Sequence, residues 1–165
     1  MIIDLLQRLE ATGLATLIRE DPLIFPWIEA VHVMAIALVL GSILIVDLRL
    51  MGLASKDYPA PALLKTVLPL TWTAFAGAAA SGALMFASQP VTYYGNFPFR
   101  MKMLLLIGAG LNMAVFHLVT QHRAGWKNQG AIPPVGARLA GAVSMLLWLG
   151  VVSFGRWIGF TIGFF

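Results

Sequence analysis

The chain has 165 residues, of which 59% are hydrophobic and 11% charged, with a formal net charge of +4 and a mean hydropathy of +0.85. Soluble domains usually carry roughly 25% charged residues, so this composition excludes an ordinary water-soluble domain and favours one compact membrane domain. There are no cysteines, which excludes a disulfide framework, a thiolate metal site and a c-type haem attached through Cys-x-x-Cys-His. In a membrane protein the positive charge is expected to report orientation, and no nucleic-acid partner is expected.

Residues 1–20 are predicted to form an amphipathic helix ahead of the membrane domain, which covers residues 21–165. One face of this helix is apolar and the opposite face is polar. The apolar face holds Ile2, Leu6, Leu9 and Leu17, and the polar face holds Asp4, Arg8, Thr12 and Arg19. Such a helix can lie in the membrane interface or pack as a surface helix on the bundle, and the sequence leaves both open.

Four apolar stretches of near bilayer length follow. They are predicted to span the membrane at residues 26–46, 66–87, 101–120 and 138–160, because a transmembrane helix needs about 20 mostly apolar residues. Pro69 is a candidate for an early kink in the second stretch. The expected fold class is therefore all-α integral membrane: a four-transmembrane-helix bundle with an N-terminal amphipathic interfacial helix.

The distribution of lysine and arginine predicts the orientation of the bundle. The loops after the first and third spans hold Arg49, Lys56, Lys65, Arg123, Lys127 and Arg138, and the opposite side holds Arg8, Arg19, Arg100, Lys102 and Arg156. Cytoplasmic loops carry an excess of lysine and arginine. We therefore expect a multi-pass protein of a bacterial inner membrane with both termini in the periplasm.

Small residues are concentrated in the second and fourth spans. Residues 74–83 consist almost only of alanine, glycine and serine, while Gly155, Gly159 and Gly163 recur at every fourth position. In lipid, small residues let helix backbones approach closely. The favoured interpretation is tight packing within one chain. The alternatives are a homo-oligomer or partner contact at the glycine stripe, and room for a flat cofactor such as haem.

Ionisable residues inside the spans are the candidates for function, because they are costly at membrane depth. Glu29 and His32 lie one turn apart on the first span, and His117 lies near the inner end of the third. The two histidines differ in depth by ~15 Å, at a rise of about 1.5 Å per residue. A single haem site ligated by both histidines is therefore disfavoured, and the pair leaves open two separate sites, one near each membrane face.

At the outer site His32 is the candidate haem ligand. Met85, near the outer end of the second span, is the candidate sixth ligand, which would make a His/Met pair. Candidate partners for the haem propionates are Arg156, Arg100 and Lys102. The alternative is a purely structural role, in which His32 pairs only with Glu29 or with a backbone carbonyl of a neighbouring helix. Glu29 itself also suits the positive end of a helix dipole.

At the inner site His117 is the candidate haem ligand. Met145 of the fourth span is its candidate partner, and Arg123 is a candidate for holding the propionates. The alternative is that His117 is merely interfacial. Asp47, at the end of the first span, is interpreted as a local ion pair with Arg49 or as a helix-end anchor.

The segment Phe25-Pro-Trp-Ile-Glu-Ala-Val-His32, with Gly41 and Asp47-Leu-Arg-Leu-Met-Gly52 after it, resembles a family of bacterial four-helix inner-membrane proteins of unknown function. The resemblance covers most of the chain. More distantly, a histidine near the start of a span, followed by small residues, is similar to copper-resistance D-type proteins and membrane cytochromes b. Those resemblances imply copper handling or haem-based electron transfer, although paired histidines at matched depth are missing.

The favoured hypothesis is a small inner-membrane subunit that binds b-type haem and takes part in electron transfer, without independent catalytic activity. One alternative is copper or other metal handling through Glu29, His32 and His117, since imidazole accepts copper readily. The other is a cofactor-free scaffold or accessory subunit of a membrane complex. The expected partners are the lipid bilayer, a homo-oligomer or larger complex, and a periplasmic redox or metal-carrying protein.

Overall fold

The computed structural model describes residues 1–54, 60–120 and 133–162, and within them it contains helices and no strand. The helices, in chain order, are α1 (Ile2–Glu10), α2 (Gly13–Glu20), α3 (Ile24–Leu50), α4 (Ala60–Ser88), α5 (Pro90–Gly95), α6 (Phe97–Val115), the π-helical turn η1 (Phe116–Thr120) and α7 (Val135–Ile162). Four of these helices are long and apolar enough to cross a membrane. The predicted all-α, four-span architecture is therefore confirmed.

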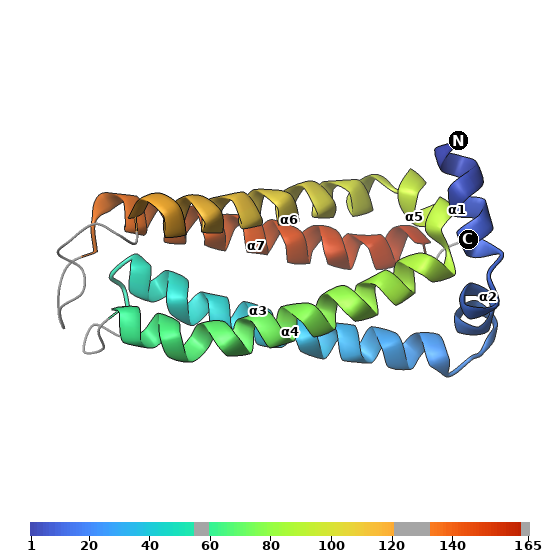
Figure 1. Cartoon of the computed structure of the whole chain (residues 1–165), viewed down its shortest axis with the longest axis horizontal. Coiled ribbons are helices and arrows are strands. Elements are labelled where there is room, and N and C mark those ends of the chain that lie inside the picture. The colour runs from blue at the N-terminus through green and yellow to red at the C-terminus, as the bar shows by residue number, and fades with distance from the viewer. Residues whose placement is uncertain (55–59, 121–132, 163–165) are drawn as a thin grey trace.

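The four long helices form two antiparallel pairs that run side by side (Figure 1). Helix α3 packs mainly against α4, and α6 packs mainly against α7. The pairs meet chiefly through α3 and α7, which leaves the α4–α6 side as the least closed side of the bundle. We call the end that holds Met1 and Ile162 the terminal end, and the opposite end the Leu50 end.

The spanning helices are longer than the sequence predicted. Three of them have 27 to 29 residues, which at 1.5 Å per residue gives about 40 Å, enough to cross both the hydrocarbon core and the headgroup regions. Their outward faces carry large exposed apolar side chains, for example Leu38, Leu104 and Leu146. Pro69 lies inside α4 and does not end it. The protein is therefore a multi-pass membrane protein.

The N-terminal segment forms two short helices, where the sequence predicted one. Thr12 breaks the helix, because its hydroxyl accepts a hydrogen bond from the amide of Ala15 and so caps α2. Both helices lie across the terminal end of the bundle (Figure 1). Ala15 and Ile18 are 0% and 2% exposed, so one face of α2 packs onto the bundle, while Leu14 and Leu17 remain exposed.

Hydrogen bonds of Arg19 and Asn96 connect the helices at the terminal end. Arg19 of α2 donates from Nη1 to the carbonyl of Ser88 at 3.1 Å, at the end of α4. Asn96 caps α6 by accepting from the amide of Phe99, and its Nδ2 donates to the hydroxyl of Thr161 on α7 at 2.8 Å. The first bond joins α2 to the end of α4, and the second joins the start of α6 to the end of α7.

Small residues set the closest helix contacts. A Cβ on Gly77 would lie 3.8 Å from Ala35, so α4 approaches α3 at ordinary van der Waals distance. The contact between α7 and α3 is tighter, because a Cβ on Gly141 would lie 2.9 Å from the backbone oxygen of Asp47 and 3.1 Å from Leu50. Gly141 is therefore the position at which the second helix pair is held against the first.

Replacing Gly141 by alanine is expected to destabilise the bundle. The added methyl meets a backbone oxygen that cannot move alone, and overpacking of this kind typically costs about 1–3 kcal/mol. The matched control is Gly41→Ala, at a position where a Cβ would meet nothing within 4 Å. Thermal unfolding in detergent should show a lower midpoint for Gly141→Ala only; equal midpoints for the two variants would show that α7 can shift away from α3 at no cost.

Candidate functional site

The first candidate site surrounds His32, about two turns into α3 from the terminal end. Its Nδ1 lies 2.9 Å from the hydroxyl oxygen of Ser81 on α4. Ser81 is buried, and its own hydroxyl donates to the carbonyl of Gly77 at 2.7 Å. The histidine is half-buried and held against the neighbouring helix.

This hydrogen-bond chain bears on which nitrogen of His32 carries the proton. A carbonyl can only accept, so when the Ser81 hydroxyl donates to Gly77 it accepts from Nδ1 of His32. This arrangement favours the tautomer with the proton on Nδ1, in which Nε2 keeps its lone pair. Histidines that bind metals are usually arranged in this way, with one ring N–H donated to a fixed acceptor and the other nitrogen left to the metal.

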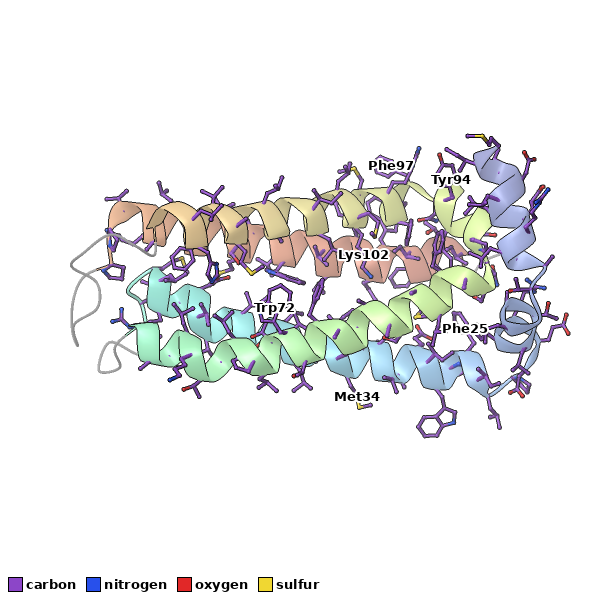
Figure 2. All side chains as sticks on the ribbon, viewed as in Figure 1. Phe25, Met34, Trp72, Tyr94, Phe97 and Lys102 are labelled. Carbon is purple, nitrogen blue, oxygen red and sulfur yellow. The ribbon has the colours of Figure 1, made fainter. Side chains whose placement is uncertain are left out.

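A glycine and a lysine complete the surroundings of His32. A Cβ on Gly82 would lie 3.0 Å from Cε1 of the imidazole, so only glycine lets the ring rest against α4. Lys102 of α6 is half-buried between the helices (Figure 2), and its Nζ lies 3.7 Å from the Cβ position of Gly155 on α7. Its charge acts on His32. The terminal half of the bundle thus holds an imidazole and an ammonium group.

The other residues predicted for this site lie in different surroundings. Met85 follows Ser81 by one turn on α4 and is half-buried, and no contact between it and His32 is shown. Arg156 is exposed, with its guanidinium carbon 4.9 Å from the centre of the Phe160 ring. Glu29 is exposed beside α5, where it is the second cause, after burial, of the raised pKa of Tyr93. Of the basic residues predicted to hold the propionates at this site, Lys102 is half-buried and Arg156 is exposed.

No bare metal site emerges from the described residues. No three of their histidine, aspartate and glutamate side chains come together as a group that could hold a metal ion. Glu29 and His32 share a face of α3 by spacing, but the imidazole is bonded to Ser81 and the carboxylate is exposed. The predicted copper ligands Glu29, His32 and His117 are therefore not brought together in this part of the chain.

The second candidate site surrounds His117 in η1, towards the Leu50 end. Its Nδ1 lies 2.9 Å from the carbonyl of Met113, so Nδ1 carries the proton here too and Nε2 keeps a lone pair. The imidazole lines a cavity of about 70 Å³ together with Asp47 of α3 and Asn112 of α6. The two histidines thus lie at opposite ends of the bundle.

The remaining predicted residues of the inner site and of the glycine stripe are distributed as follows. Met145 is half-buried on α7 and does not line the cavity beside His117. Gly155 packs on Lys102 within the chain, whereas a Cβ on Gly159 would meet nothing within 4 Å. Arg123 and Gly163 lie outside the described residues. A role of Gly159 in oligomer formation stays a prediction.

Two polar residues of the structure, Ser81 and Asp47, were not predicted as members of a site. Ser81 was seen only as one of many small residues in α4, and Asp47 as the end of a span. A signal did exist for Asp47, because a carboxylate in an apolar helix is expensive unless the interior of the protein uses it. For Ser81 there was none, since serine is common where helices pack closely.

Replacing Ser81 by alanine is expected to free the His32 ring. The buried Nδ1–H would lose its acceptor, which typically costs about 1–3 kcal/mol, and the proton would no longer be confined to Nδ1. Nitrogen-15 NMR of labelled histidine should show the Nδ1-protonated form in the wild type and a mixture in Ser81→Ala. Ser153→Ala, which removes an exposed hydroxyl bonded to Leu149, is the control. An Nε2-protonated His32 in the wild type would contradict the assignment.

Comparison with known proteins identifies a family for the chain. It belongs to a family of unknown function (DUF6644), which matches residues 23–161. The match covers the four spans and begins after α2. No curated protein and no solved structure matches the chain. A similarity to copper-resistance D-type proteins or to membrane cytochromes b is thus not shown.

Proposed function

We propose that this member of the family is a small inner-membrane subunit that binds b-type haem through Nε2 of His32 and takes part in electron transfer. The observation that carries the proposal is the bond from His32 Nδ1 to Ser81 at 2.9 Å. It leaves an oriented imidazole lone pair inside a membrane-spanning bundle. An idle imidazole at this depth would be costly.

Haem suits this ligand set better than a bare metal ion does. Structural zinc sites use four protein ligands and catalytic zinc sites usually three, and the described residues bring no such group together. A haem iron already has its four porphyrin nitrogens and needs only one or two axial ligands from the protein. One fixed imidazole is therefore sufficient, and Met85 on α4 remains the candidate for a sixth ligand.

The charge near His32 supports the same ligand. Lys102 is half-buried, and among the described residues no carboxylate forms an ion pair with it. A cation in a low-dielectric interior is stabilised by an anion close to it. Haem propionates would supply that anion, and Lys102 is the best placed of the basic residues that the sequence offered for this role.

Room for the haem would have to come from the α4–α6 side. The cavity between the two helix pairs has a volume of about 200 Å³ and is lined mainly by apolar side chains, including Val39, Phe75 and Trp148. It begins at Val39, about two turns along α3 from His32, and none of His32, Met85 and Lys102 lines it. Sites for drug-sized ligands enclose roughly 300–1,000 Å³, so this cavity must widen. Trp72, which lines it, is 51% exposed and lies between α4 and the second pair (Figure 2), so it can rotate outward.

The modest charge bias favours the periplasmic side of a bacterial inner membrane for the terminal end, and with it for His32. A haem at this depth would be within reach of a periplasmic redox partner at one face and of a second membrane component from the side. A homo-oligomer or a larger membrane complex would supply that component. The protein itself would need no catalytic residue.

The test is the absorption spectrum of the detergent-purified full chain, recorded oxidised and reduced, before and after titration with haemin. We expect one b-type haem per chain, loss of binding in His32→Ala, and retention in the matched variant His117→Ala. Ser81→Ala should weaken binding by about 10–100-fold, as loss of a ligand's hydrogen-bond partner typically does. A wild-type chain without a Soret band would refute the proposal, and binding that depends on His117 alone would refute the assignment to His32.

A further inference from the structure

A second site lies at the other end of the bundle and does not depend on the proposal for His32. The cavity of about 70 Å³ is lined by residues of α3, α4, α6, η1 and α7. Its polar lining consists of Asp47, Thr71, Asn112, His117 and Ser144. All other lining residues are apolar, so the polar groups form one isolated cluster within the spans.

Asp47 is the charged member of this cluster. It is 4% exposed, and its Oδ2 is fully buried with no hydrogen-bond donor in the part of the chain that the structure describes. The hydroxyl of Ser144 interacts with the same carboxylate as a hydrogen-bond donor. One buried oxygen of a carboxylate thus faces the cavity unpaired, which is costly for an ionised group.

Apart from Ser144, the polar side chains beside Asp47 in the cavity use donor hydrogens on other partners. Thr71 donates its hydrogen to Ser42 at 2.8 Å or to the carbonyl of Val67 at 3.1 Å. Asn112 donates from Nδ2 to the carbonyl of Ala140 at 2.9 Å, which leaves its Oδ1 and one N–H. His117 donates from Nδ1 to Met113, which leaves the Nε2 lone pair. The polar lining of the cavity therefore offers more hydrogen-bond acceptors than free donors.

Among the described residues, no lysine or arginine brings a positive charge into the cavity. No lysine or arginine is among the residues that line it, and His117 is the other titratable group there. Arg49 is also buried, at 2% exposed. It follows Asp47 by two residues, however, which places it about 200° further around α3. From α4, α6 and α7 the cavity receives only uncharged polar groups, Thr71, Asn112 and Ser144.

We propose that this cavity binds a small monovalent cation, a proton or Na⁺, with Asp47 as its counter-charge. A carboxylate, a hydroxyl and an amide oxygen are the hard ligands that such ions prefer. The volume of about 70 Å³ is that of roughly two water molecules, which admits an ion with one water and excludes an organic ligand. A proton would lie on Asp47 and be shared with Nε2 of His117.

Infrared difference spectroscopy of the full chain in detergent tests the proposal, because a protonated carboxylic acid has a C=O band that a carboxylate lacks. The spectra are recorded across pH in N-methylglucamine chloride, a cation too large for the cavity, and again in NaCl. We expect a band that is lost in Asp47→Asn and kept in the control Glu20→Gln, an exposed carboxylate. Loss of the band on adding Na⁺ at constant pH identifies Na⁺, and loss only on raising the pH identifies the proton.

Thr71→Val provides a second test that keeps Asp47 intact. Removing one lining oxygen should weaken the effect of Na⁺, or shift the midpoint of the proton titration, by about tenfold, which corresponds to 1.4 kcal/mol. Thr73→Val is the matched control, since Thr73 is exposed and bonds only to the carbonyl of Leu70. The proposal is overturned if Asp47→Asn removes no carboxylic acid band of the wild type and the carboxylate bands of the wild type do not respond to Na⁺.

Discussion

Polar side chains within the spans of this protein have to find their partners inside the protein, because hydrocarbon offers neither donors nor acceptors. Ser81 meets that requirement by bonding back to its own helix and across to His32. Ser42 does so by donating to Val39 and accepting from Thr71. These hydrogen bonds depend on close helix contact, which the small residues of α4 and Gly141 of α7 permit. The packing of glycine and alanine is thus what holds the polar groups in register.

His32 and Asp47, the members of the two candidate sites on α3, lie about 22 Å apart along the helix at 1.5 Å per residue. The terminal half holds a fixed imidazole and a half-buried ammonium group, an arrangement that suits an anionic cofactor. The other half holds a buried carboxylate among lone pairs, which suits a cation. A redox centre and a cation site at opposite ends of one bundle would let electron transfer and cation binding influence each other through α3, the helix that carries a member of both sites.

Much of the fold was predictable from the sequence, because span length and apolarity are direct consequences of bilayer thickness. The break at Thr12 was harder to predict, since an amphipathic pattern continues across it, and only the Thr12 hydroxyl, which accepts from the amide of Ala15, marks the start of a second helix. The candidate site was predictable in part. His32 and His117 are rare residues at an expensive depth, whereas the role of Ser81 depends on which face of α4 meets α3, and helical spacing within one span does not contain that information.

The sequence by itself determined that this chain spans a membrane four times and which few ionisable groups lie within the spans, because both follow from the transfer energies of individual residues. Only the tertiary structure decided which of them work together. It placed Lys102, and not Arg156, inside the bundle, and it brought Asp47 and His117 to one cavity. Those outcomes depend on how the helices are rotated and paired, which is a property of the contacts between spans and of no single span.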